Sequence, residues 1–128
     1  MAGRLLDTSI LLTHWHGPRA RRRTAEEARA WAEELVRIHR TSFIVSPVYL
    51  EFVCGAQSRG ELMLAEAYLS VFEVKDNWEI RPEDLRQAAR IARRVPADGS
   101  RRQFGDCLIR AMANRLKCAV LSFDARFP

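Results

Sequence analysis

The chain has 128 residues, of which 48% are hydrophobic and 29% charged, with only six glycines and five prolines. This composition excludes a disordered, collagen-like or low-complexity protein, and the length is that of one domain, so we expect a single domain over residues 1–128. No apolar run approaches the roughly 18 residues that cross a bilayer, and the N-terminal apolar run is too short for a signal peptide. We therefore expect a cytoplasmic protein with no membrane partner.

The charge of the chain favours a polyanionic partner. The 21 Lys and Arg residues exceed the 16 Asp and Glu residues, which gives a formal net charge of +5. Only Lys75 and Lys117 are lysines, so 19 of the basic residues are arginines. The guanidinium group binds phosphates and carboxylates through two parallel hydrogen bonds. A codon bias toward arginine explains the choice of Arg over Lys equally well, but it does not explain the net positive charge.

Short apolar segments alternate with amphipathic segments along the chain. The first half predicts a strand at Arg4–Leu6, a helix from a capping box at Thr24 to about His39, a strand at Phe43–Val45, and a helix that Ser46 caps and Gly60 interrupts. The second half predicts helices over Glu61–Phe72, from Pro82 to Pro96 and over Gln103–Leu116, with strands at Phe72–Val74 and Ala119–Ser122. This alternation predicts an α/β fold in which helices cover both faces of a parallel sheet.

Four acidic residues differ from the acids at helix starts and on polar faces. Asp7 and Asp124 directly follow predicted strands. Glu51 lies inside an apolar string, and Asp106 stands in the first turn of a predicted helix. Each has a simpler explanation when it is taken alone: a helix cap, a turn, a solvated side chain, or, for Asp106, stabilisation of the helix dipole or an ion pair with Arg110.

Taken together, the four acids predict a cation site. In a doubly wound sheet, the ends of the strands and the starts of the following helices face the same edge. Two unit charges about 4 Å apart repel by about 4 kcal/mol at an effective dielectric constant of about 20, so converging carboxylates hold protons or bind a cation. Oxygen ligands select Mg²⁺ or Mn²⁺ over zinc, and such ions polarise phosphoryl oxygens. The rest of the chain, at +9, would attract a polyanion.

The four acids stand in motifs that resemble those of PIN domains, in the same order and over essentially the whole chain. The motifs are Arg4-Leu-Leu-Asp7-Thr8-Ser9, Ser46-Pro-Val-Tyr-Leu-Glu51-Phe-Val-Cys-Gly55, Phe104-Gly-Asp106-Cys-Leu-Ile-Arg-Ala111 and Ala119-Val-Leu-Ser122-Phe-Asp124-Ala-Arg-Phe127. The length is similar to that of the VapC-type toxins of bacterial toxin–antitoxin pairs. The resemblance implies a PIN-like three-layer fold with a parallel β-sheet flanked by helices.

The same resemblance implies a Mg²⁺- or Mn²⁺-dependent endoribonuclease that acts as the toxin of such a pair. The acidic residues that match the catalytic and metal-binding quartet are Asp7, Glu51, Asp106 and Asp124. The hydroxyl residues that match groups orienting these carboxylates are Thr8, Ser9 and Ser122, the last standing where threonine is usual. The partners that we expect are an RNA substrate, a cognate antitoxin and a second copy of the chain in a homodimer.

Other functions fit the same residues less well. A HAD-type phosphatase requires a second Asp two residues after the first, where Ser9 stands, and a receiver domain requires its late lysine at a place other than that of Lys117. A non-catalytic RNA-binding or protein-interaction module on the same fold stays open as the alternative. RNA binding without cleavage in Mg²⁺ or Mn²⁺ would favour that alternative.

The basic run between the first two elements is a candidate RNA-binding segment. Its arginines are Arg19, Arg21, Arg22 and Arg23. They either contact phosphates or form a solvated loop. The nearby Trp15 either stacks on a base or packs in the core.

The cysteines give no sign of a disulfide framework or a soft-metal site. They are Cys54, Cys107 and Cys118, an odd number without metal-ligand spacing, in apolar surroundings. We expect three buried thiols.

Overall fold

A computed structural model describes residues 3–95 and 103–128 of the chain. Its one sheet contains four parallel strands in the order β3-β2-β1-β4. The strands are β1 (Arg4–Leu6), β2 (Phe43–Ile44), β3 (Glu73–Val74) and β4 (Ala119–Leu121). The chain moves outward from β1 to β2 and β3, and then returns to the other side of β1 to form β4. This reversal brings the carboxyl ends of β1 and β4 side by side, which is where parallel sheets form their binding sites.

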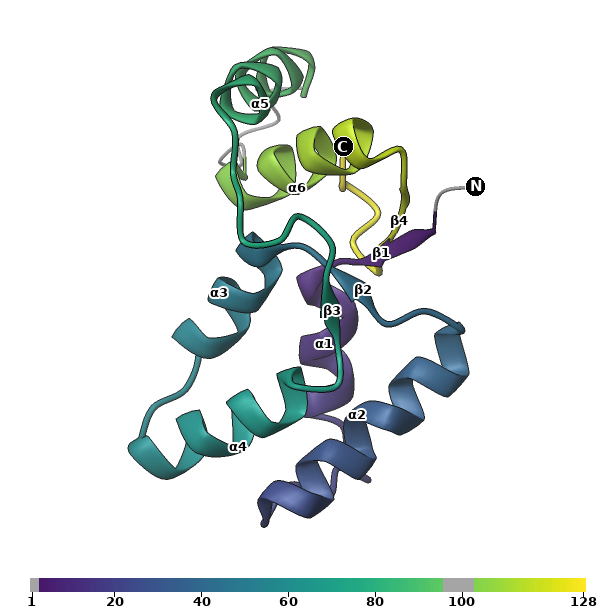
Figure 1. Cartoon of the computed structure of the whole chain (residues 1–128), viewed down its shortest axis with the longest axis vertical. Helices are drawn as coiled ribbons and strands as arrows, with labels where there is room; N and C mark the ends of the chain where they lie inside the picture. The colour runs from purple at the N-terminus through teal and green to yellow at the C-terminus, as the bar shows by residue number, and fades with distance from the viewer. Residues whose placement is uncertain (1–2, 96–102) are drawn as a thin grey trace.

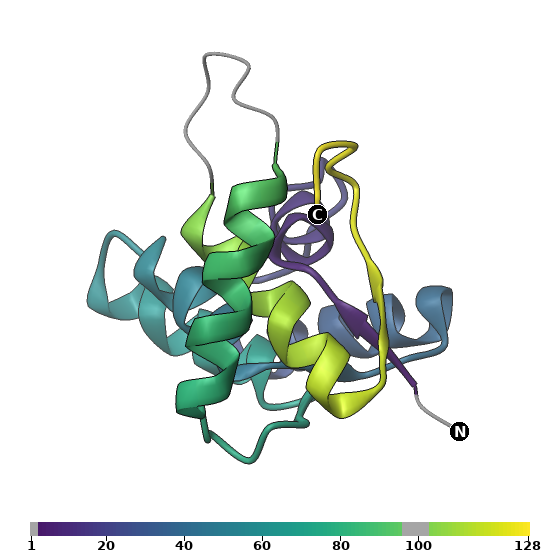
Figure 2. The ribbon, with the colours of Figure 1, turned by 90° about the horizontal axis from the view of Figure 1, so that it is seen from above.

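Helices cover both faces of the sheet. In the described part of the chain they are α1 (Thr8–Trp15), α2 (Ala25–His39), α3 (Ser46–Cys54), α4 (Arg59–Leu69), α5 (Pro82–Arg94) and α6 (Phe104–Leu116). Figure 1 shows α1 to α4 on one side of the sheet and α5 with α6 on the other. Figure 2 shows α5 crossing over α6, and these two helices pack closely. The arrangement confirms the predicted α/β fold and its parallel sheet.

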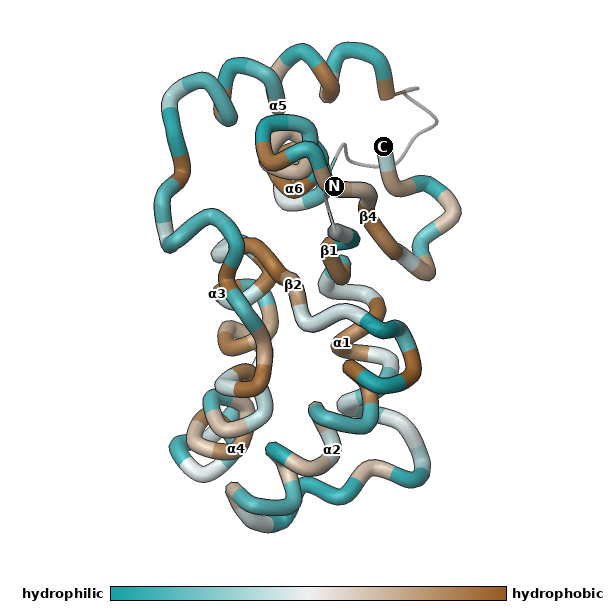
Figure 3. Tube along the Cα trace, turned by 45° about the vertical axis from the view of Figure 1, so that its right-hand side comes forward, coloured by the Kyte–Doolittle hydropathy of each residue, from teal (hydrophilic) through white to brown (hydrophobic). Residues whose placement is uncertain are grey.

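The core fixes the helices whose first turns face the site. Its fully buried members include residues of β1, α1, α3 and α6, namely Leu5, Leu6, Ile10, Leu11, Val48, Ile109 and Met112. An aromatic cluster joins α1, α3 and α4, because the ring of Tyr68 stacks on Phe52 and meets the edge of Trp15. Figure 3 shows hydrophobic residues along β4 and at the start of α3, whereas most of α5 is hydrophilic.

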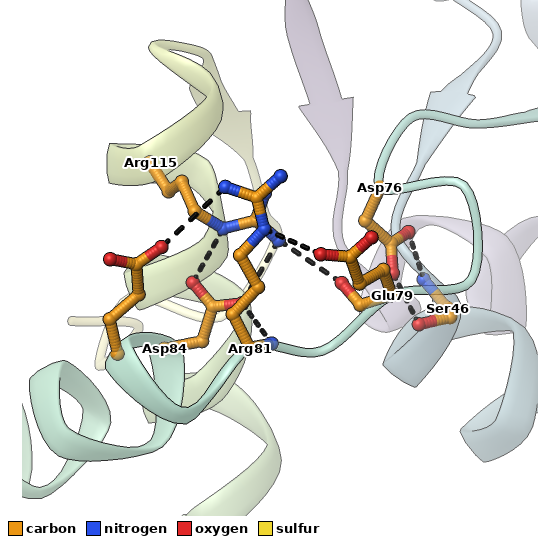
Figure 4. Close-up of polar contacts among 7 residues, drawn as sticks. Ser46, Asp76, Glu79, Arg81, Asp84 and Arg115 are labelled. Carbon is orange, nitrogen blue, oxygen red and sulfur yellow. Dashed lines mark hydrogen bonds and ion pairs between the residues drawn. The ribbon is translucent and has the colours of Figure 1, made fainter.

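The start of α3 is held by a buried carboxylate from a distant part of the chain. Asp76, which follows β3, accepts hydrogen bonds from the backbone N–H of Ser46 at 2.9 Å and from its hydroxyl at 2.5 Å. Figure 4 shows this contact beside a second polar network. Ser46 was predicted as the N-cap of this helix, but Val45 takes that position and Ser46 is the first helical residue. The prediction was wrong because the capping oxygen comes from a residue 30 positions away.

A buried ion pair locks α5 onto α6. The guanidinium of Arg115 donates to both carboxylate oxygens of Asp84, at 2.8 and 2.9 Å, and to the carbonyl oxygen of Glu79. Asp84 also accepts a hydrogen bond from the backbone N–H of Arg81 (Figure 4). Asp84 is only 1% exposed, so this bidentate pair compensates a carboxylate that water does not reach.

Several boundaries differ from the predictions. The break between α3 and α4 falls after Cys54, not at Gly60, because the hydroxyl of Ser58 caps α4 by accepting from the N–H of Glu61. The apolar pattern of the helix predicted over 103–116 places Phe104 on its inward face, but this residue is 73% exposed. The predicted helix end at Pro96 lies outside the described residues, as does Asp98-Gly99-Ser100, which the sequence predicts to be a turn.

The cysteines differ in burial. Cys54 is exposed, contrary to the prediction of three buried thiols, whereas Cys107 and Cys118 are buried. Within the described residues, no helix combines the length and the apolar character that crossing a bilayer requires.

Candidate functional site

Asp7 lies at the centre of the candidate site. Its backbone N–H continues the β1–β4 ladder by donating to the carbonyl oxygen of Leu121 at 2.9 Å. Its carboxylate is 2% exposed, and one oxygen, Oδ2, accepts from the hydroxyls of Ser9 at 2.9 Å and Ser122 at 2.7 Å. The other oxygen, Oδ1, is buried and has no hydrogen-bond partner among the described residues. Asp7 stands at the N-cap position of α1, but its side chain makes no capping hydrogen bond.

The two serine hydroxyls tie the start of α1 to the segment after β4. Their oxygen atoms lie 3.2 Å apart. Ser9 Oγ accepts from the backbone N–H of Phe123 at 3.0 Å, and Ser122 Oγ accepts from the N–H of Asp124 at 3.0 Å. Because these N–H groups occupy acceptor positions of both hydroxyls, the hydroxyl protons are directed toward Asp7. The orienting role that the resemblance implies for Ser9 and Ser122 therefore has a defined geometry here.

Glu51 reaches the site from α3 and is held between two other helices. Its Oε1 accepts from the hydroxyl of Thr8 at 2.7 Å. Its Oε2 lies against Gly105 in the first turn of α6, where a Cβ added to the glycine would stand only 2.7 Å from that oxygen. Desolvation raises the pKa of Glu51; the Thr8 hydrogen bond opposes this rise, and the charge of Asp7 adds to it. Glu51 is an exposed residue, but its carboxylate is held by Thr8 and lies within the field of Asp7.

Asp106 shows that all four predicted acids share one electrostatic environment. Partial burial raises its pKa to about 6, with further contributions from the charges of Asp7, Glu51 and Asp124. It stands in the first turn of α6. This place agrees with stabilisation of the helix dipole, one of the two simpler explanations for Asp106. The other, an ion pair with Arg110, is not found among the described residues, where the Arg110 guanidinium lies over the ring of Phe127, 5.2 Å from its centre.

Asp124 lies in a turn beside the site. Its Oδ1 accepts from the backbone N–H of Arg126 at 2.9 Å, and its carbonyl oxygen accepts from the N–H of Phe127 at 3.1 Å. The turn explanation for this residue is therefore correct as a description of its local structure. Its charge nevertheless acts on Asp106, so the turn holds a carboxyl group near the other acids.

The chemistry of the donor set fits a hard divalent cation. The groups gathered here are four carboxyl groups and three hydroxyls, and oxygen donors of this kind suit Mg²⁺ or Mn²⁺. The orphaned oxygen of Asp7 is the observation that supports the fit, since a buried carboxylate oxygen without a donor is costly. In the ranges 3–95 and 103–128, no three Asp, Glu, His or Cys side chains lie close enough together to form a finished ligand cluster.

The other predicted candidates lie elsewhere. Arg19, Arg21 and Arg23 line a pocket near the start of α2, beyond the end of α1 that lies farther from Asp7. Arg22 instead places its guanidinium 5.0 Å from the centre of the Trp15 ring. Trp15 is 2% exposed, so it packs in the core and is not available to stack on a base.

Two residues that matter to the site were not predicted. Gly105 was not predicted because its contact with Glu51 joins positions 54 residues apart. Asp76 could have been identified from the sequence, because it lies shortly after β3, much as Asp7 follows β1. It supports the start of the helix that carries Glu51.

Comparison with known proteins identifies the family of the chain. The family model of the PIN domain matches residues 4–128, which is nearly the whole chain. No curated protein and no solved structure matches. Proteins with this domain are generally nucleases.

Proposed function

Because the chain belongs to the PIN domain family, we propose that it is a Mg²⁺- or Mn²⁺-dependent endoribonuclease and the toxin of a type II toxin–antitoxin pair. The observation that carries the proposal is the environment of Asp7: a buried carboxylate whose Oδ2 is oriented by two serines while its Oδ1 has no donor in the described structure. The raised pKa of Asp106 supports it, because its causes include the charges of the three other acids.

Some residues would bind the cation directly, and others hold those ligands in position. Asp7, Asp106, Asp124 and Glu51 would supply the ligands. A bound Mg²⁺ or Mn²⁺ supplies Lewis-acid chemistry, polarising the phosphoryl group and activating water. Thr8 holds Glu51, and the two serines hold Asp7, so less conformational entropy is lost when these carboxylates bind a cation.

Charge on the rest of the chain complements the acidic site. A cluster of carboxylates alone repels RNA. The basic residues outnumber the acidic ones by five over the whole chain, which increases the local concentration of a polyanion around the protein.

The proposal is tested by incubating the protein with total RNA in Mn²⁺, in Mg²⁺ or in EDTA. We expect discrete cleavage products with either metal and none in EDTA. RNA that is bound in Mn²⁺ but stays intact would contradict the nuclease and favour a non-catalytic RNA-binding module on the same fold.

The partner that we propose is an antitoxin that competes with metal. An arginine fork from such a partner can pair with two carboxylates at once. We expect the antitoxin to bind across a groove flanked by helices 24–39 and 46–58 and to place this basic side chain near Asp7 and Asp106.

Linkage tests this competition. Raising Mn²⁺ should weaken binding of the antitoxin, and Asp7→Asn should reduce that dependence, because a shared site makes the two ligands exclude each other. An affinity that is the same with and without Mn²⁺ would assign inhibition to a partner bound elsewhere.

A further inference from the structure

The segment between α1 and α2 presents three arginines on one side. Over residues 19–23 the side chains alternate, with Arg19, Arg21 and Arg23 exposed and Ala20 and Arg22 partly buried. Arg22 anchors the segment, because its guanidinium packs on the buried ring of Trp15. The three other arginines of the segment are exposed and border the same pocket.

These three arginines line one pocket of about 770 Å³. Among the described residues, none of the three side chains has an ion pair or a hydrogen bond. The α2 side of the pocket contributes Trp31 and the carboxylates of Glu27 and Glu34. Three cations against two anions leave the pocket with net positive charge. Its volume lies in the range of ligand sites.

The position of the pocket relative to the acidic site sets the size of its ligand. The acids lie at the start of α1, and the arginine segment follows its end. Eight residues of helix span about 12 Å, so the two sites are separated by at least this length along α1. Figure 1 shows α1 leading away from the sheet toward the start of α2. A ligand that occupied both sites would have to be a chain several units long.

We propose that this arginine pocket binds the phosphate backbone of single-stranded RNA, several nucleotides from the bond that is cut. The inference rests on the proposed ribonuclease function and adds to it a second site on the substrate. Guanidinium groups bind phosphates bidentately. Three cations that line one pocket would bind the backbone of a strand that enters this pocket, which a flexible single strand can do and a rigid duplex cannot.

The test compares two triple variants that lose the same charge. The pocket variant is Arg19→Gln, Arg21→Gln, Arg23→Gln, and the control is Arg86→Gln, Arg90→Gln, Arg93→Gln on the exposed side of α5. Binding of a labelled single-stranded 12-mer is measured by fluorescence anisotropy in EDTA at several salt concentrations. Each lost phosphate contact reduces the slope of log affinity against log salt by about 0.7 for a single strand. We expect the pocket variant to lose about two units of slope and the control less than one.

A second variant tests the sign of the charge effect. Because Glu27 and Glu34 offset the positive potential of the pocket, Glu27→Gln with Glu34→Gln should bind the 12-mer more tightly. Weaker binding by this double variant would contradict phosphate as the ligand.

Cleavage measurements separate this inference from the proposed function. In Mn²⁺, the pocket variant should raise KM for the 12-mer, leave kcat unchanged, and have no effect on a substrate of three nucleotides. Equal slopes for the two triple variants, or tighter binding of a duplex than of a single strand, would overturn the pocket assignment. Cleavage of RNA by the wild type would still support the proposed ribonuclease function in that case. Absence of both binding and cleavage in the wild type would overturn both.

Discussion

The contact between Glu51 and Gly105 gives a test in which stability and activity change in opposite directions. Gly105→Ala places a methyl group 2.7 Å from Oε2, so the carboxylate must move away from its position. Alanine is favoured over glycine in helices by about 0.5–1 kcal/mol, so unfolding should require more free energy, not less. We expect about a tenfold loss of cleavage rate, which corresponds to about 1.4 kcal/mol of transition-state stabilisation. Denaturant unfolding and RNA cleavage measure the two effects.

Gly60→Ala is the matched control. Gly60 also lies in the first turn of a helix, α4, but its added Cβ would meet only the Ser58 hydroxyl at 4.0 Å. It should bring a similar change in stability and full activity. If both variants kept full activity, the position of Glu51 would not matter for cleavage.

Asp106 predicts how the metal-free protein responds to pH. Its folded-state pKa of about 6 lies above the ordinary value of 3.8, mainly because of burial and then because of the neighbouring acids. Between these values the folded state binds more protons than the unfolded state, so this group's contribution to stability is fully present below about pH 4 and is lost as pH rises to about 6. Asp106→Asn should remove that loss. Urea unfolding in EDTA at pH 4, 5, 6 and 7 measures it, and identical pH profiles for the two proteins would contradict the assignment.

At the scale of elements, the pairing of α5 with α6 depends on one ion pair. Arg115→Ala leaves the carboxylate of Asp84 buried without its cation, and breaking a buried pair costs about 3–5 kcal/mol. We expect a loss of about 3 kcal/mol, because Arg115 itself is partly exposed. Arg86→Ala on the exposed side of α5 should change stability by less than about 0.5 kcal/mol. A loss as small for Arg115→Ala would mean that the pair does not hold these helices together.

The pH dependence of this pair follows from Asp84. Burial acts to raise the pKa of Asp84, but the hydrogen bonds from Arg115 and from the backbone of Arg81 lower it overall. A depressed carboxyl pKa stabilises the fold above the ordinary value near 3.8, and this stabilisation is lost as pH falls through the folded-state pKa. The difference in stability between wild type and Arg115→Ala should therefore shrink below about pH 4.

Helices and strands were predictable where local chemistry decides them, and less so where distant contacts do. The capping hydroxyl of Thr24 accepts from the N–H of Glu27 as expected, and α2 runs to His39. The start of α3 was misjudged because Asp76 supplies its cap from the other end of a β-α-α-β unit. Phe104 carried a helical apolar pattern, but its position at the first residue of α6 leaves it beyond the core.

The candidate site was likewise predictable only in part. Strand ends at one edge of a parallel sheet made the convergence of Asp7 and Asp124 predictable from general topology. The partners that orient each carboxylate were less predictable. The Ser122–Asp7 hydrogen bond joins residues 115 positions apart, so it was the resemblance to PIN motifs, and not periodicity, that indicated Ser122. No local signal indicated that Gly105 borders Glu51.

At the scale of the whole molecule, a cation should stabilise the folded chain. A ligand that binds only the folded state at 100 times its Kd adds about 2.7 kcal/mol to the free energy of unfolding. Mn²⁺ should therefore raise the melting temperature of the wild type by several degrees, and Asp124→Asn should reduce this shift. Metal-free buffer with EDTA gives the baseline. An equal shift in both proteins would place the bound ion away from Asp124.

The central claim is that a cation held at Asp7 drives RNA cleavage, and the most direct measurement compares wild type with Asp7→Asn. Asparagine keeps the shape of the side chain and relieves repulsion among the acids, so the metal-free variant should melt no lower than the wild type. Glu66→Gln on the exposed side of α4 is the control. Even residues that only support metal ligands cost about 10–100-fold when they are changed, so the cleavage rate of Asp7→Asn in Mn²⁺ should fall by more than about 100-fold while Glu66→Gln cleaves normally. A folded Asp7→Asn protein that cleaves RNA at the wild-type rate would contradict the account.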